Sequence, residues 1–74
     1  MTKLMMKYVN ETKEYVIEIM TSEYNFDEIR ANDIVKKSSF SKLLNEDPLY
    51  VMHYNVEYWV EKILQEHQRT YELR

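Results

Sequence analysis

The chain of 74 residues contains no glycine and a single proline. Tight turns and β-hairpins use glycine to reach positive φ values, so a chain without glycine is poorly suited to strand hairpins. Helices joined by short connections have no such requirement along most of their length. The composition therefore favours an all-α fold, and the length predicts a single domain over residues 1–74.

The first segment, over residues 2–22, has the periodicity of an amphipathic helix. At 100° per residue, its apolar positions fall within an arc of about 140°. These positions are Met5, Tyr8, Val9, Thr12, Tyr15, Val16, Ile19 and Met20. Charged side chains lie opposite, so we expect a long N-terminal helix that covers the core with one face.

Two or three short helices are expected in the middle of the chain. Asn25 is placed as an N-cap, and Glu28 follows three residues later, as in a capping box. Ser38-Ser39 interrupts the helical pattern, and a further short helix is predicted over residues 40–44.

The strongest local signal is Asp47-Pro48. Asp is a favoured N-cap, and Pro at the first helical position already has a helical φ. No further helix breaker occurs before about Glu72, so the sequence predicts one long C-terminal helix over residues 48–72, about 37 Å in length. Its main apolar arc includes Leu49, Met52, Val56, Trp59, Val60 and Ile63.

A row of aromatic residues lies opposite that arc in the first half of the predicted C-terminal helix. Tyr50, Tyr54 and Tyr58 are four residues apart and are accompanied by Val51, so their side chains are expected on one side of the helix. The middle helices have few apolar residues left to cover this side. We therefore predict that Tyr50, Val51, Tyr54 and Tyr58 form an interface, with Tyr54 at its centre.

Association would also compensate for the small size of the chain. Domains of this length bury roughly 60% of the surface of the unfolded chain and are marginally stable alone. The chain has no Cys, which excludes disulfides and thiolate metal sites. The sequence thus predicts a helical homodimer, or binding to another protein, with the C-terminal helix providing the contact.

Residues 33–44 resemble the centre of a helix-turn-helix motif, with Ile34 and Phe40 at its apolar positions, although Ser39 stands where the turn usually has Gly. Four basic residues and one acidic residue give residues 30–42, which we call the basic segment, a charge of +3, whereas the whole chain carries −3. Basic and hydroxyl side chains contact phosphates in DNA complexes. The candidate DNA contacts are Arg30, Lys36, Lys37, Ser41 and Lys42. The alternative interpretation is a structural helical corner.

The sequence offers little support for catalysis. A Gly-rich phosphate loop and a Cys nucleophile are excluded by composition, and neither His is paired with a Ser in a recognisable nucleophile arrangement. His53, Glu57 and Glu61 recur at intervals of four, but they drift around the helix and do not form a ligand set. We predict no enzyme activity, no catalytic residues, no metal site, no cofactor and no small-molecule substrate.

These observations lead to one expected function and one alternative. The expected function is a non-enzymatic interaction or regulatory protein of the cytoplasm, because no apolar run reaches the length of a membrane span and no signal peptide opens the chain. Its partner would be a second copy or another protein, with no membrane contact. The alternative is a helix-turn-helix-like DNA-binding regulator that dimerises through its last helix.

Overall fold

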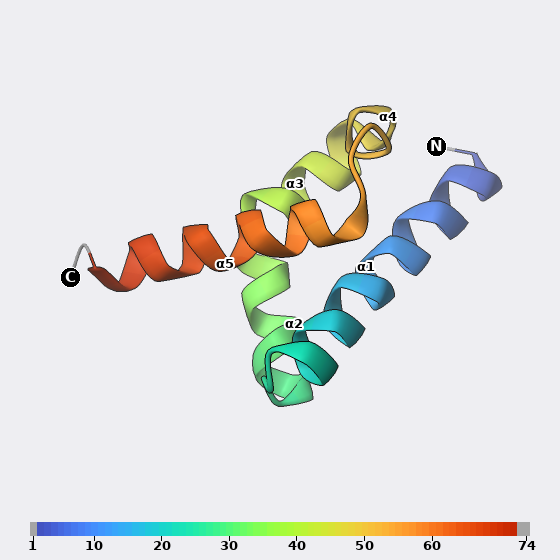
Figure 1. Cartoon of the computed structure of the whole chain (residues 1–74). Coiled ribbons are helices and arrows are strands. Elements are labelled where there is room, and N and C mark those ends of the chain that lie inside the picture. The colour runs from blue at the N-terminus through green and yellow to red at the C-terminus, as the bar shows by residue number, and fades with distance from the viewer. Residues whose placement is uncertain (1, 73–74) are drawn as a thin grey trace.

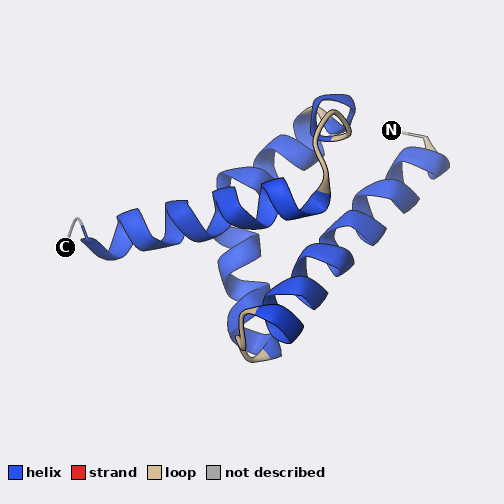
Figure 2. Ribbon diagram, in the orientation of Figure 1, coloured by secondary structure: helices blue, strands red, loops and turns tan. Residues whose placement is uncertain are grey.

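The computed structural model describes the backbone of residues 2–72 and the side chains of residues 2–68. Within this range the chain is helical and contains no strand, which confirms the predicted all-α class (Figures 1 and 2). The helices are α1 (Lys3–Glu23), α2 (Glu28–Lys37), α3 (Ser39–Glu46), α4 (Pro48–Val51) and α5 (Val56–Glu72). Loops are confined to short connections between them (Figure 2).

Helix α1 packs one face against α2 and α5, as its amphipathic pattern predicts. The helix begins where the Thr2 hydroxyl accepts a hydrogen bond from the Met5 N–H at 3.2 Å. Val9, Val16 and Met20 from α1 are buried in the core.

The predicted N-cap at Asn25 is wrong. Asn25 instead adopts a left-handed conformation, with φ 61°, and forms part of the reversal between α1 and α2. Asn tolerates this conformation better than most residues, and this chain has no Gly to take its place. The cap of α2 is Asp27, whose Oδ1 accepts from the Arg30 N–H at 2.9 Å.

The interruption predicted at Ser38-Ser39 is a junction in which Ser38 ends α2 and begins α3. The Ser38 hydroxyl donates to the Val35 carbonyl at 2.6 Å and accepts from the Ser41 N–H at 3.3 Å. Ser38 is buried, so these bonds satisfy polar groups away from water. One side chain thereby caps two helices.

The single helix predicted over residues 48–72 is wrong, because the chain breaks at residues 52–55. Asp47 and Pro48 begin a helix as expected, but α4 is only four residues long. In a continuous helix the Val51 carbonyl would accept from the N–H of residue 55. Here it accepts from the Trp59 indole N–H at 3.0 Å, while the Asn55 side chain caps α5 by accepting from the Tyr58 N–H at 2.9 Å.

The core draws on all five helices described. Its fully buried side chains include Val16 and Met20 from α1, Leu44 from α3, and Val60 and Ile63 from α5. In Figure 1, α2 and α3 lie behind α1 and α5, and the C-terminal half of α5 extends away from the other helices. The molecule is accordingly elongated, with extents of 39 × 24 × 19 Å.

Candidate functional site

The three predicted interface tyrosines come together, although they do not lie on one helix. Tyr50 is in α4, Tyr54 is in the connection over residues 52–55, and Tyr58 is in α5. The rings of Tyr54 and Tyr58 stack with centroids 4.3 Å apart, and the Tyr50 ring meets the Tyr54 ring edge-on at 5.9 Å. We call Tyr50, Tyr54 and Tyr58 the tyrosine ridge.

The buried Trp59 ring packs against the ridge from the side of the core. It lies edge-on to all three tyrosine rings at centroid distances of 5.0–6.2 Å. Edge-to-face pairs of this kind contribute about 0.5–1.5 kcal/mol each beyond the burial of area. Phe40 packs against Trp59 at 5.6 Å, so the ridge is attached to the core through Trp59.

The ridge is partly exposed, and apolar neighbours extend it. Tyr50 and Tyr54 are each 42% exposed, while Leu49 and Met52 are 64% and 53% exposed. The break at residues 52–55 explains these last two values, because it turns Leu49 and Met52 away from the core that a continuous helix would have reached. We call Leu49, Tyr50, Met52 and Tyr54 the apolar corner.

Val51 does not belong to this surface. The sequence placed it beside the tyrosines, but its side chain is 1% exposed and lies in the core of its own chain. The short helix α4 points Val51 inward because its neighbours Tyr50 and Met52 take the outward positions. The interface prediction is therefore corrected to exclude Val51.

The neighbouring phenols of the ridge affect the pKa of Tyr50. Tyr54 raises the pKa of Tyr50, first through the repulsion between two phenolates and then through a hydrogen bond between the side chains. Tyr58 has a different neighbour, the Lys62 ammonium, which lies 5.4 Å from its ring centroid in a cation–π arrangement. The raised pKa keeps the Tyr50 phenol neutral around neutral pH, so this side chain presents an apolar ring with a polar tip.

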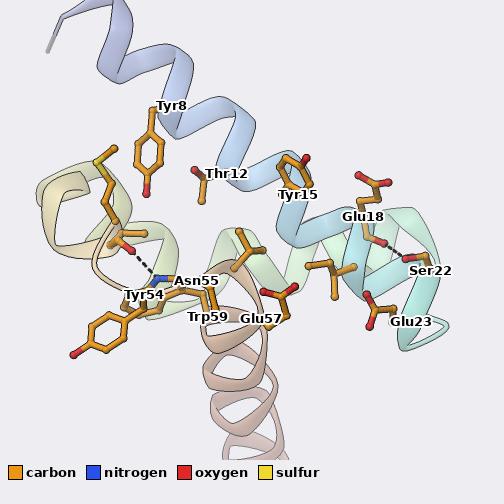
Figure 3. A pocket seen from close by; sticks show the side chains of 14 residues that line it. Tyr8, Thr12, Tyr15, Glu18, Ser22, Glu23, Tyr54, Asn55, Glu57 and Trp59 are labelled. Atoms are coloured by element: carbon orange, nitrogen blue, oxygen red, sulfur yellow. Dashed lines mark hydrogen bonds between the residues drawn. The ribbon is translucent and has the colours of Figure 1, made fainter.

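Two grooves flank the ridge. The small groove, of about 380 Å³, lies on the α3 side and includes Leu43, Tyr50, Tyr58 and Lys62 among its lining residues. The large groove, of about 640 Å³, lies between α1 and residues 51–59 (Figure 3). Trp59 lines both grooves. The sequence did not predict the large groove, because it depends on the break after α4.

The basic segment is only partly available for contact with phosphates. Arg30, Lys36 and Lys42 are exposed, as the DNA-binding alternative requires. The Lys37 ammonium, however, pairs with the Asp33 carboxylate at 3.2 Å. Ser41 was predicted as a phosphate contact, but it is 9% exposed and packs inward, because it follows the buried cap Ser38 by less than one turn.

A carboxylate already occupies the N-terminus of α3. Glu66 from α5 accepts from the Ser39 N–H at 2.8 Å and also from the Ser39 hydroxyl. Exposed N–H groups at a helix N-terminus are the usual place for an anion such as a DNA phosphate. In this molecule an intramolecular carboxylate takes that place.

The residues weighed as metal ligands do not assemble into a site. His53 lies in the connection after α4, whereas Glu57 and Glu61 lie in α5. Across the described part of the chain, no group of three or more His, Cys, Asp or Glu residues could hold a metal ion.

Comparisons with known proteins add no family to this geometry. No protein-family model, no curated protein and no solved structure matches the chain. Among the described helices, none combines the length and apolar character needed to cross a membrane. The candidate functional surfaces are therefore the tyrosine ridge, the apolar corner and the two grooves.

Proposed function

We propose that this protein is a non-enzymatic interaction protein of the cytoplasm that forms a homodimer through the tyrosine ridge. The observation that carries the proposal is the exposure of aromatic rings fixed in place by the core. Tyr50 and Tyr54 remain 42% exposed while both contact the buried Trp59 ring. Rigid, partly exposed aromatic rings are typical of interface hot spots, because they bury a large area at little entropic cost.

The shape of this surface supports pairing between two copies. The small groove lies directly beside the ridge and shares Tyr50 and Tyr58 with it. In a twofold dimer, each copy would place the same surface on the other. Tyr54 of one copy would then enter the small groove of the second copy, next to Leu43, and the reverse contact would form at the same time.

The area of the apolar corner sets the expected strength of the dimer. Its four side chains expose roughly 400 Å² together, within the range of the largest apolar patches on soluble monomers. Two such patches would bury about 800 Å² in total, which is less than the roughly 1,000 Å² that a stable specific interface usually buries, so the dimer would be a weak and transient one. We therefore expect a reversible dimer with a Kd on the order of 10–100 μM.

The test is the oligomeric state of the parent and of Tyr54→Glu, measured by sedimentation over a range of concentrations. A carboxylate in the centre of the interface should weaken the dimer by about 2 kcal/mol or more, so its Kd should rise more than about tenfold. Tyr24→Glu is the matched control, because Tyr24 is 46% exposed and lines neither groove.

The outcomes are distinct. A dimeric parent, a monomeric Tyr54→Glu variant of unchanged helicity and a dimeric Tyr24→Glu variant support the proposal. A parent that stays monomeric at several hundred micromolar, on the order of ten times the expected Kd, contradicts it. Equal weakening by both substitutions would place the contact outside the ridge.

The DNA-binding alternative receives less support. Its exposed cations Arg30, Lys36 and Lys42 are compatible with phosphate contacts. Against it stand the ion pair of Lys37, the burial of Ser41 and the carboxylate at the N-terminus of α3. We therefore keep protein–protein contact as the proposed function.

A further inference from the structure

The large groove shares Met52 and Tyr54 with the surface of the proposed dimer and extends from them along α1. Along α1 its lining runs from Tyr8 to Glu23, and its opposite wall is formed by residues 51–59. The fifteen steps of helix from Tyr8 to Glu23 span about 22 Å, which is the length of about four turns of a partner helix. Figure 3 shows Tyr8 and Tyr54 toward one end and Glu18 and Glu23 toward the other, with Glu57 between them.

The groove is aromatic and apolar from its Tyr8 end to Tyr15, which lies about midway along α1 (Figure 3). Tyr15 is 60% exposed and Met52 is 53% exposed, although both line a concave surface. Adaptable Met and rigid aromatic side chains around a groove between helices are typical of sites that receive the apolar face of an amphipathic helix.

All charged residues that line the groove are acidic. Three carboxylates line it, those of Glu18, Glu23 and Glu57, and no Lys, Arg or His is among its lining residues. Within the described part of the chain, none of the three forms an ion pair. Carboxylates gathered along a concave wall attract a cationic partner, and the nearby tyrosine rings favour cations as well.

Thr12 supplies an independent indication of a ligand. Its side chain lines the groove and is 7% exposed. Its hydroxyl has no hydrogen-bond partner among the described residues, whereas the hydroxyls of Thr21 and Ser22 both donate to the Glu18 carbonyl. No polar side-chain atom that is sealed from solvent lacks a partner in this part of the molecule, so the Thr12 hydroxyl must open onto the groove. A bound partner can supply the missing hydrogen bond.

From these observations we propose that the large groove binds a cationic amphipathic segment of a partner protein. The segment would be a helix of about 14 residues, matched to the length of the groove. Its apolar side chains would lie between Tyr8, Tyr15 and Met52, and its Lys or Arg side chains would reach Glu18, Glu23 and Glu57. This partner is selected by charge, in contrast to the self-association proposed for the ridge.

Trp59 makes the proposal directly measurable. It is the only tryptophan of the chain and it lines the groove, so its fluorescence reports on binding of a peptide that lacks tryptophan. The probes are three synthetic peptides of about 14 residues: an amphipathic Leu/Lys helix, the same pattern with Glu in place of Lys, and a scrambled Leu/Lys sequence with no apolar face.

The Leu/Lys helix should bind at least about tenfold more tightly than either of the other two peptides, and its binding should weaken with salt. Equal binding of the Leu/Glu helix would show that charge does not select the partner and would overturn the proposal. Equal binding of the scrambled peptide would reduce the contact to attraction between opposite charges and would also overturn it. Binding of none of the peptides overturns it as well.

Two charge reversals locate the contact. Glu18→Lys and Glu57→Lys should each weaken binding of the Leu/Lys helix by about tenfold. Glu14→Lys is the matched control, because it makes the same change on an exposed position of α1 that does not line the groove. An equal effect of all three substitutions would indicate attraction to the net charge alone and would contradict a groove site. Circular dichroism on each variant checks that the helices persist.

Three further measurements separate this site from its alternatives. Thr12→Val should weaken binding by roughly threefold without changing the preference for Lys over Glu. Displacement of the peptide by micromolar spermidine would identify a small cation as the ligand and would overturn the proposal. Tyr50→Glu, which changes the small groove only, should abolish dimerisation and retain peptide binding. Failure of the dimer and failure of the groove are therefore distinguishable.

Discussion

The two places where helices meet at a sharp break differ in what they leave at the surface. At the α2–α3 junction, the buried Ser38 caps both helices, and apolar side chains on either side, Val35 and Phe40, enter the core. At the α4–α5 connection, the backbone is also capped, but Tyr50, Met52 and Tyr54 stay exposed. At both breaks a side chain caps the following helix by accepting a hydrogen bond from a backbone N–H. Only the second presents apolar surface, and it does so at the candidate interface.

The difference shows that a helix break can serve two purposes. The Ser38 junction closes the core, because it places Phe40 and Leu44 of α3 in the same buried cluster as Val35 of α2. The connection over residues 52–55 places rings outside the core while Trp59 holds them from within. The first break contributes to stability, and the second arranges a surface.

The largest expected effect concerns Trp59, which joins the connection to the core. Trp59→Ala removes a buried ring and the donor to the Val51 carbonyl, so the free energy of unfolding should fall by about 3–5 kcal/mol. Trp59→Phe keeps an apolar ring and should cost less. Denaturant unfolding followed by circular dichroism measures both. A loss below about 1 kcal/mol for Trp59→Ala would mean that Trp59 does not anchor the connection.

A smaller effect compares the two caps. Ser38→Ala removes a buried cap with two hydrogen bonds and should lower the free energy of unfolding by about 1–2 kcal/mol. Asn55→Ala removes one exposed cap and should cost about 1 kcal/mol or less. The same unfolding experiment on both variants tests the order. If Asn55→Ala proves the more costly, the connection and not the junction is the more important for stability.

The Ser38 junction also lies within the basic segment. Retention of DNA by the protein tests whether that segment contacts phosphates. We expect no retention of duplex DNA at about 50 mM salt, since Lys37 is paired and Glu66 occupies the N-terminus of α3. Retention that falls steeply with salt, and that is lost on changing Lys36, Lys37 and Lys42 to Glu, would instead establish the DNA-binding alternative.

The smallest expected effect is the pH dependence of the ridge. The pKa of Tyr50 is raised by Tyr54, so the folded state favours the neutral phenol. The resulting stabilisation is fully present below the pKa of the unfolded chain, about 10, and is lost as pH rises through the higher folded pKa. The free energy of unfolding should thus be constant between about pH 7.5 and 9 and fall only in stronger alkali. Denaturant unfolding across this range, with tyrosinate absorbance recorded in parallel, would reveal an earlier transition.

The sequence by itself determined the helical class and most helix ends. The absence of Gly disfavours hairpins, and side chains within four residues cap the helices, as Asp47 and Ser38 do. Such signals are local, so they can be read without knowledge of the fold. They also predicted that Tyr50, Tyr54 and Tyr58 would share a surface, although for the wrong reason, because the helix that was to align them does not exist.

Only the tertiary structure decided where the last helix breaks and which surfaces that break creates. The periodicity of residues 48–72 was compatible with one helix, and Asn55 was a weak local signal against it. At the break, the Val51 carbonyl accepts from the Tyr54 N–H at 3.3 Å, and its hydrogen bond from the Trp59 indole connects the break to α5, which packs against α1 and α3. The interaction joins residues eight apart and depends on burial by other helices. The helical periodicity of the sequence does not reveal this hydrogen bond. The large groove depends on the break at which it forms.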